Sequence, residues 1–475
     1  MKKHFLGLGT GARRAVLLLA LAGLGPAAHA QLFAPKTDYP TGAGPVGVAL
    51  GDVNGDTRPD LVTANSGTNT NTVSVLLGTG AGVFGPKADY PTGLNPTSVA
   101  LGDVNGDGRP DIVTANSDRN TNTVSVLLGA GAGVFGPKTD FPTGMQPASV
   151  VLGDVNGDGR PDIVTANSGS NSVSVLLNTG TGAFGPPTGF PIGGAGSSVA
   201  LGDVNGDGRP DLAAVNNNIG TVSVLLGTGA GVFGPKTDYP TSATPFGVAL
   251  GDVNGDGRPD IVTANVFTNS VSVLLGTGAG AFAPPTNSPA GAGALAVALG
   301  DVNGDGRPDI VTANGGFNTN AVSVLLGTGA GAFGPKTDYP AGSSTFSVAL
   351  GDVNGDGRLD IVTANTSVNT VSVLLNVGTF LGARGGLAAA GGGLYPNPAT
   401  PAGFTVLLPA GAGAAGAAVR LELVNTRGQV VRRQAAAVPA AGAGLAVEAA
   451  GLAAGVYALR LHVGGRVLTQ RLVLQ

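Results

Sequence analysis

A ten-residue segment that recurs seven times constrains this chain more than any other feature. Its first copy is Gly51–Asp60, with the sequence GDVNGDTRPD. The first aspartates of the seven copies are Asp52, Asp103, Asp154, Asp203, Asp252, Asp301 and Asp352. Repetition at a period of about 50 residues predicts a repeat architecture in which every unit folds in the same way.

The side chains of this segment are those that a calcium ion prefers. Oxygen ligands at loop positions one, three, five and nine, a backbone carbonyl at position seven and a glycine at position six are typical of calcium loops. One copy alone would also suit a plain turn, but seven copies in register favour calcium, in about seven sites. The predicted ligands are Asp52, Asn54, Asp56, Arg58, Asp60, Asp103, Asn105, Asp107, Arg109, Asp111, Asp154, Asn156, Asp158, Arg160, Asp162, Asp203, Asn205, Asp207, Arg209, Asp211, Asp252, Asn254, Asp256, Arg258, Asp260, Asp301, Asn303, Asp305, Arg307, Asp309, Asp352, Asn354, Asp356, Arg358 and Asp360, each arginine through its carbonyl.

The charge of the repeat region supports the same interpretation. Residues 31–378 contain 27 aspartates, no glutamate, 5 lysines and 8 arginines, a net charge of −14. The seven segments, at −2 each, account for all of it, and seven divalent cations would neutralise it. The whole chain is at −4, so nothing suggests a nucleic-acid-binding surface, and the absence of cysteine excludes disulfides and thiolate sites.

The N-terminal segment predicts export. Met1–Ala30 has a basic start, the apolar run Ala15–Leu24 and the small-x-small pattern Ala28-His29-Ala30, as a secretory signal peptide does. The apolar run is too short for a membrane anchor, and no other stretch of the sequence could span a bilayer.

Each repeat unit carries four strand signals and no helical periodicity. In the second unit these are Ser98–Leu101, Asp111–Ala115, Thr123–Leu128 and the proline-containing Phe135–Phe141. The length of the unit varies only between the second and third strands, which marks a surface loop. Four short strands per unit favour a β-propeller blade over a β-solenoid or a string of small domains.

The two ends of the repeat region predict how a propeller would close. The seventh unit stops near Gly378 without a fourth strand, and the missing segment stands at the other end as Phe33–Pro40, FAPKTDYP. Pairing of the two would cover both exposed edges. The sequence thus predicts an all-β fold: a seven-bladed β-propeller over residues 31–378, closed by an N-terminal strand, and then a small β-sandwich.

Composition changes after the repeats. Residues 379–393 are rich in glycine and alanine and predict a flexible linker. Residues 394–475 hold seven arginines against two glutamates and form the last predicted domain. Its predicted strands are Val419–Val424, Gln429–Arg433, Gly455–Val463 and Arg466–Leu474.

These motifs resemble two known families. The repeats are similar to FG-GAP/VCBS repeats, which build the calcium-loaded propeller of integrin α chains, and the resemblance implies calcium at the loop between the first two strands of each blade. The segment Leu394–Pro398, LYPNP, with the terminal strands resembles the type A sorting domain of type IX secretion substrates; an immunoglobulin-like adhesive module is the alternative. That resemblance implies the type IX machinery as a partner, and a secreted or outer-surface location in a Gram-negative bacterium.

Two copies depart from the loop pattern. Thr57 stands where the other six copies have glycine, and a positive φ there is unfavourable for a β-branched residue, so the first site should be the weakest. Leu359 replaces the proline in the seventh copy and should loosen that loop slightly.

The repeat region lacks the residues that catalysis needs. Residues 31–378 contain no histidine, and nearly every ionisable group comes in copies, whereas an active site is unique and asymmetric. We therefore expect no enzyme. A polysaccharide lyase is the runner-up, and Arg119 is its only candidate as a non-repeated basic residue.

The variable loops are the predicted recognition surface for an extracellular glycan or protein. The loops between strands two and three share one end of the blades with the blade connections, opposite the acidic loops. The candidate ligand-binding residues there are Arg119, Asn217, Phe267 and Phe317. Sequence drift in unconstrained loops explains the same variation, and a purely structural surface component is a further alternative. The repeated aromatic residues of the fourth strands are expected to pack between blades rather than bind sugar.

Overall fold

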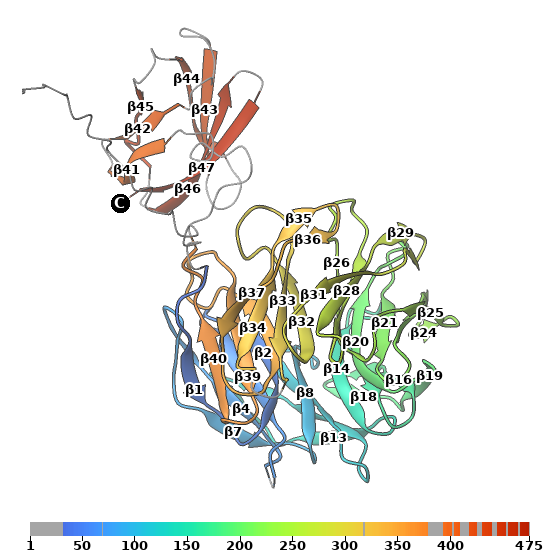
Figure 1. The fold of residues 1–475 in the computed structure, drawn as a ribbon. Coiled ribbons are helices and arrows are strands. Elements are labelled where there is room, and N and C mark those ends of the chain that lie inside the picture. Colours follow the sequence, from blue (N-terminus) through green and yellow to red (C-terminus); the bar gives the residue numbers. More distant parts are fainter. Residues whose placement is uncertain are drawn as a thin grey trace, which may run out of the picture.

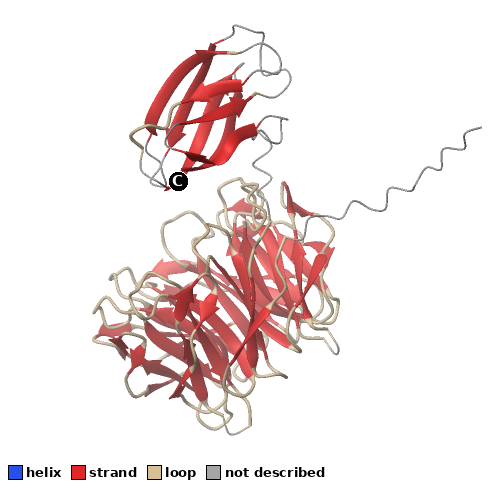
Figure 2. Ribbon diagram, turned by 90° about the vertical axis from the view of Figure 1, so that its left-hand side faces the viewer, coloured by secondary structure: helices blue, strands red, loops and turns tan. Residues whose placement is uncertain are grey.

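The computed structural model describes residues 32–68, 70–316, 319–378, 393–400, 403–408, 418–424, 430–438, 444–452, 455–463 and 466–474. These residues form strands, turns and bends, and contain no helix (Figure 2). Accordingly, no helix among them is long and apolar enough to cross a membrane. The predicted signal peptide and, apart from Gly393, the predicted linker lie outside the described residues.

Seven four-stranded antiparallel sheets are built from residues 37–374. The first has the order β2 (Pro45–Gly51), β3 (Asp60–Asn65), β4 (Thr72–Leu76) and β7 (Ala88–Pro91). All of β3 and most of β4 are buried, which explains their apolar and β-branched sequences. Each sheet is open, with two edge strands.

The other six sheets repeat this order. The second to fourth are β8 (Pro96–Gly102), β9 (Asp111–Asn116), β10 (Thr123–Leu127) and β13 (Thr139–Pro142); β14 (Pro147–Gly153), β15 (Asp162–Asn167), β16 (Ser172–Leu176) and β19 (Thr188–Pro191); and β20 (Gly196–Gly202), β21 (Asp211–Asn216), β22 (Thr221–Leu225) and β25 (Thr237–Pro240). The fifth to seventh are β26 (Pro245–Gly251), β27 (Asp260–Asn265), β28 (Ser270–Leu274) and β31 (Thr286–Pro289); β32 (Ala294–Gly300), β33 (Asp309–Asn314), β34 (Ala321–Leu325) and β37 (Thr337–Pro340); and β38 (Thr345–Gly351), β39 (Asp360–Asn365), β40 (Thr370–Leu374) and β1 (Thr37–Pro40).

The N-terminal strand completes the last sheet, as the sequence predicts. β1 pairs antiparallel with β40, with Thr37 opposite Val373 and Pro40 opposite Thr370. A bridge between Phe33 and Asn376 extends the pairing. In Figure 1 the blue β1 accordingly lies beside the orange β40.

The predicted fourth strand is wrong in its bounds, because it is split. Instead of one strand over Phe135–Phe141, a short hairpin ends at Phe135 and β13 begins at Thr139. Pro137 interrupts the strand between them, since proline has no N–H for a ladder. The hairpins are β5 (Gly78–Gly80) with β6 (Val83–Phe84), β11 (Gly129–Gly131) with β12 (Val134–Phe135), β17 (Asn178–Gly180) with β18 (Ala183–Phe184), β23 (Gly227–Gly229) with β24 (Val232–Phe233), β29 (Gly276–Gly278) with β30 (Ala281–Phe282), and β35 (Gly327–Gly329) with β36 (Ala332–Phe333).

The apolar cores lie between consecutive sheets. Val62 of the first sheet packs in one cluster with Ile112 and Leu127 of the second. Leu61 packs in another cluster with Val362 of the last sheet. Likewise, β2 contacts both β8 and β38, the first strands of the sheets on either side.

The repeated aromatic residues also join consecutive sheets. Tyr90 of the first sheet meets Phe135 edge-on, with ring centroids 5.4 Å apart. Five further pairs have the same edge-on form: Phe33–Tyr339, Tyr39–Phe84, Phe141–Phe184, Phe190–Phe233 and Tyr239–Phe282. The prediction that these side chains pack between neighbouring units is confirmed for the six pairs, which join consecutive sheets.

The C-terminal strands form a separate seven-stranded sheet with the order β44-β43-β46-β47-β41-β42-β45. Their bounds are β41 (Gly393–Thr400), β42 (Gly403–Leu407), β43 (Ala418–Val424), β44 (Val430–Ala437), β45 (Gly444–Val447), β46 (Gly455–Val463) and β47 (Arg466–Leu474). One core joins its two ends, since Phe404 and Leu445 cluster with Leu421 and Leu459. The four predicted strands are present, and β41, β42 and β45 were missed.

Candidate functional site

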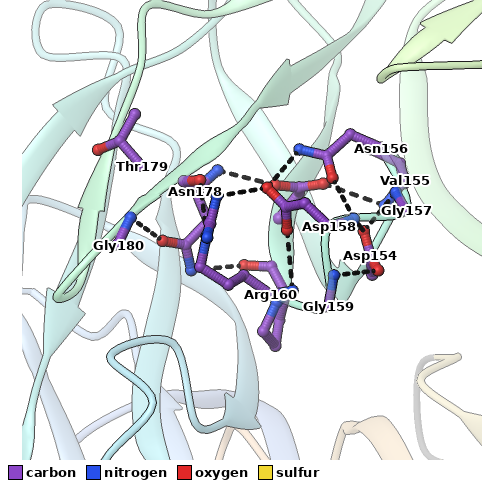
Figure 3. A network of polar contacts seen from close by, with 12 residues as sticks. Asp154, Val155, Asn156, Gly157, Asp158, Gly159, Arg160, Asn178, Thr179 and Gly180 are labelled. Carbon is purple, nitrogen blue, oxygen red and sulfur yellow. Dashed lines mark hydrogen bonds and ion pairs between the residues drawn. The ribbon is translucent and has the colours of Figure 1, made fainter.

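The candidate site is the loop between the first and second strands of each sheet. In the third copy it runs from Asp154 to Pro161, and Figure 3 shows its side chains. Gly157 and Gly159 adopt φ values of 80° and 84°, which only glycine takes without strain. These two residues give the loop its tight turn.

The aspartate at position one organises the loop backbone. Oδ1 of Asp154 accepts hydrogen bonds from the N–H groups of Gly157 (2.7 Å) and Asp158 (3.1 Å), and Oδ2 accepts one from Gly159 (2.7 Å). Asn156 Oδ1 accepts a further bond from the Asp158 N–H at 2.8 Å. The first half of the loop is thus wrapped around its own aspartate and asparagine (Figure 3).

The aspartate at position nine links the loop to the rest of the sheet. Asp162 is fully buried, and it accepts N–H bonds from Val155 (3.0 Å) and Asn178 (2.7 Å). In all seven copies the equivalent distances are 2.8–3.0 Å and 2.7 Å. Because Asn178 begins the hairpin after the third strand, this hairpin and the acidic loop share one end of the sheet, as expected.

The two kinds of aspartate differ in their ionisation. Burial raises the pKa of Asp162, and the nearby carboxylates of Asp158 and Asp154 add to the rise, although backbone bonds oppose it. In the sixth and seventh copies, burial raises the pKa of Asp309 to about 7 and that of Asp360 to about 6. For Asp154, burial is the largest single influence and acts to raise the pKa, but the backbone N–H bonds together outweigh it, so the pKa is lowered.

An ion pair that the sequence argument missed lies at position seven. The guanidinium of Arg160 donates to Asp158 Oδ2 at 2.6 Å (Figure 3), and the same arginine–aspartate pair occurs in all seven loops at 2.6–3.9 Å. The alternating acidic and basic residues at positions five and seven were the available signal. The predicted role of the arginine carbonyls stays a prediction.

The donors of the loop fit calcium in kind. A carboxylate has about four lone-pair sites, of which Asp162 uses two and Asp154 three for backbone N–H groups, so each can still accept a cation. However, in the part of the chain that the structure describes, no three His, Cys, Asp or Glu side chains gather as a metal-binding group. The carboxylates of one loop instead serve separate N–H groups, and calcium binding stays a prediction.

The two departures from the loop pattern are visible in the structure. Thr57 adopts a φ of 72°, in the left-handed region where the glycines of the other copies lie. Leu359 packs, partly buried, in the core cluster of the sixth and seventh sheets, near Gly300.

The predicted recognition residues lie at the opposite end of the sheets. Arg119, Asn217 and Phe267 stand in the loops after β9, β21 and β27, and Phe267 is 78 % exposed. Phe317 lies outside the described residues. Val266 N–H donates to the carbonyl of Thr244 in the preceding connection, which places that loop and connection at one end, as expected. No contact between the described residues brings the three candidates together.

A buried polar network, also missed by the sequence argument, crosses each sheet near the variable end. In the third sheet, Thr165 donates to Asn167 Oδ1 at 3.0 Å, and Asn167 Nδ2 donates to Ser174 at 2.9 Å. In the fourth sheet Ala214 replaces the threonine, and Asn216 Oδ1 is buried without a partner. The recurring TAN and SVS triplets were the signal for this network.

Comparisons with known proteins support both resemblances. A family model described as an FG-GAP-like repeat matches residues 52–114, 103–165, 154–214, 203–263, 252–312 and 301–363, which together span more than half of the chain. A second family model, described as a secretion system C-terminal sorting domain, matches residues 393–475. No curated protein matches the chain.

Solved structures share the fold. The structure of BBS1N in complex with ARL6DN, soaked with lead, has a TM-score of 0.52 and 12 % identity, and covers 73 % of this chain and 97 % of that one. Its mercury-soaked counterpart has a TM-score of 0.51 and 14 % identity, with the same coverage. An Agrocybe aegerita lectin has a TM-score of 0.44 and 22 % identity, covering 69 % of this chain and 86 % of that one.

The likeness to the two BBS1N structures shows a propeller-like all-β fold and nothing of a ligand. The sorting domain indicates export by the type IX secretion system, whose machinery is thereby a partner, to the outside of the cell or its surface. The chain therefore belongs to the FG-GAP-like repeat family and ends in a secretion sorting domain.

Proposed function

We propose that the seven sheets are the blades of one closed β-propeller, whose variable end recognises a glycan or protein outside the cell. Support for closure comes from β1, which joins the last sheet, and from the contact between β2 and β38. A shared core between the first and last sheets, with Leu61 and Val362 in one cluster, supports the same arrangement. A ring of this kind would hold its loops in fixed positions.

The observation that carries the recognition role is the exposure of unlike apolar side chains at one end. Phe267 is 78 % exposed, Ile219 49 % and Val368 47 %, in equivalent loops of the fifth, fourth and seventh sheets. No fold requirement explains a phenylalanine there, because the sequences of five of the seven equivalent loops do without one. Exposed apolar groups among polar neighbours are typical of binding surfaces.

The acidic loops would have a structural role in this function. In the third copy, Asp154, Asn156, Asp158 and Asp162 would hold a calcium ion. The bound ion would supply positive charge that offsets the repulsion among these carboxylates. The chain's own backbone bonds to Asp154 and Asp162 would keep the loop in place on the sheet.

Binding is favoured over catalysis as the role of this surface. Arg119 is the one non-repeated basic residue of the repeat region, and residues 31–378 contain no histidine that could act as its catalytic partner. A polysaccharide lyase would need such a partner. Lyase activity would be recognised by the formation of cleaved product, whereas a binding protein would retain the intact glycan.

A glycan and matrix-protein array with the full chain tests the proposal. Binding that weakens for Phe267→Ala, and that chelation also weakens, would support recognition by the variable end of a calcium-stabilised ring. The matched control is Val134→Ala, because Val134 is 52 % exposed in a hairpin at the other end. Equal loss for both variants, or no ligand at all, would contradict the proposed surface, and cleavage of a glycan would favour the lyase.

A further inference from the structure

The C-terminal sheet has one apolar face and one charged face. On β43, Leu421 and Leu423 are buried in the core, so Arg420 and Glu422, which alternate with them, belong to the other face. Alternation of this kind is expected where one face of a sheet covers a core. The charged face is independent of the acidic loops and of the variable loops of the repeat region.

Strand pairing gathers basic residues on this face. Arg433 of β44 and Arg460 of β46 both stand opposite Glu422, and His462 of β46 stands opposite Arg420. Paired residues of antiparallel strands share a face. We call these four basic residues, with the glutamate between them, the basic face.

Glu422 is the buried centre of the basic face. Its side chain is only 9 % exposed, and Oε1 accepts a hydrogen bond from Arg433 Nε at 3.1 Å. Arg420 Nη2 lies 3.6 Å from the same oxygen, and His462 Nε2 lies 3.5 Å from Oε2. The bond from Arg433 lowers the pKa of Glu422, so the carboxylate is ionised at neutral pH.

The positive charge of the basic face exceeds what one carboxylate needs. Three arginines surround one glutamate, which leaves a net charge of +2 with His462 neutral. The side chains of Arg420 and Arg433 are 58 % and 68 % exposed, and Arg433 uses only Nε toward Glu422. The two terminal nitrogens of Arg433 and Nη1 of Arg420 can therefore serve an external anion.

We propose that the basic face binds the phosphate headgroups of an anionic lipid surface. A guanidinium presents several N–H donors in a planar fork that matches phosphate oxygens. The face belongs to a sheet, so several arginines can meet a membrane plane together. Val430 and Val431, at the start of β44, are 36 % and 40 % exposed, and partly exposed apolar groups beside arginines suit a membrane–water interface. Export to the outside of the cell or its surface brings this domain to such membranes.

Vesicle flotation with the full chain tests this proposal. The probes are mixed phosphatidylglycerol–phosphatidylcholine vesicles and pure phosphatidylcholine vesicles, in chelator, so that calcium cannot bridge the acidic loops to lipid. We expect binding to the mixed vesicles only. Each basic side chain near an anionic surface contributes about fivefold in affinity, so Arg460→Ala should weaken binding by about that factor.

Arg460→Ala is the informative variant because the contacts that hold Glu422 come from Arg433, Arg420 and His462, and they remain. Arg460→Lys keeps the charge and should bind nearly as well. Lys138→Ala removes an equal charge from the repeat region, where Lys138 pairs with Asp140, and should change nothing.

Four results would overturn the proposal. Equal binding to neutral vesicles, or equal loss with Lys138→Ala, would show that the basic face is not responsible. Displacement from the vesicles by inorganic phosphate, beyond that by sodium chloride of equal ionic strength, would assign the face to free phosphate. Capture by polyglutamate without binding to anionic vesicles would assign it to an acidic protein.

Discussion

The two ends of the seven sheets differ in how far their residues and contacts repeat from copy to copy. At the acidic-loop end, the position-nine aspartates accept the same two backbone bonds in every copy, with distances of 2.8–3.0 Å and 2.7 Å. At the variable end, equivalent loops carry Arg119, Ile219, Phe267 or Val368, all exposed. One scaffold therefore keeps one end constant while the other changes freely.

The difference teaches which kind of contact fixes a sequence. Asp162 serves two buried N–H groups, so its replacement leaves two donors without partners. Phe267 has a side chain largely in solvent, so the sheet does not depend on it. Repetition marks the requirements of the fold, and the unlike residues are the ones available for recognition.

The largest effect is expected from a substitution at the acidic-loop end. In chelator, Asp162→Ala should lower the free energy of unfolding by about 2–4 kcal/mol, because the N–H groups of Val155 and Asn178 lose their acceptor in a buried place. Phe267→Ala should change it by less than about 0.5 kcal/mol. Urea denaturation of both variants measures the contrast, and equal effects would show that the two ends do not differ in this way.

The next effect concerns pH and compares the buried aspartates at position nine with those at position one of the acidic loops. The pKa values of about 7 for Asp309 and about 6 for Asp360 lie above the ordinary 3.8. A group whose pKa is higher in the folded than in the unfolded state stabilises the fold fully at a pH below its unfolded-state pKa. This stabilisation is lost as the pH rises through the folded-state pKa. Without calcium, stability should therefore fall between about pH 5 and about pH 8 by a few kcal/mol.

Thermal unfolding in chelator across this range measures the trend. Asp309→Asn should flatten the fall, because its side chain no longer titrates. Asp154→Asn should not, because the pKa of Asp154 is lowered and its titration lies at the acid end. A stability that rises from pH 5 to pH 8 in the unmodified chain would contradict the assignment to buried aspartates.

Much of the fold could be predicted because the same strand pattern occurs in seven copies, so features shared by all copies stand out from variation in single copies. The seven copies of the strand pattern predicted the sheets. The Phe33–Pro40 segment, which stands before the first unit and is missing from the last, predicted the pairing of β1 with β40. The candidate loops were placed at the correct connections for the same reason. The buried role of Asp162 was not foreseen, since a ligand and a backbone acceptor have the same sequence signal.

Other features could not be predicted because they depend on side-chain direction or on weak strands. The pairing of Arg160 with Asp158 needs the loop geometry, which brings positions five and seven to one side. In the C-terminal sheet, β41 contains two prolines and β45 is short, so neither shows the alternation that revealed β43 and β46.

A smaller effect tests whether all seven acidic loops are equivalent. Thr57 has a φ of 72°, a region unfavourable for a β-branched residue by about 1–2 kcal/mol. Thr57→Gly should therefore stabilise the first loop by about 1 kcal/mol after the loss of chain entropy, and should strengthen its calcium binding. The reverse change, Gly108→Thr, should weaken the second loop equally. Calorimetric titration with calcium would count the sites and rank them, and an unchanged weakest site would refute this account.

The smallest effect lies in the one sheet that departs from the polar network near the variable end. Asn216 Oδ1 is buried without a partner, whereas the equivalent Asn167 Oδ1 accepts a bond from Thr165 at 3.0 Å. Ala214→Thr should supply the missing hydroxyl and stabilise the chain by about 1 kcal/mol. Ala214→Val adds similar volume without a donor, so it separates the hydrogen bond from better packing. If the valine stabilises as much as the threonine in urea denaturation, the orphaned oxygen is not the cause. A gain confined to threonine would show that the fourth sheet lacks a stabilising hydrogen bond that the other six sheets have.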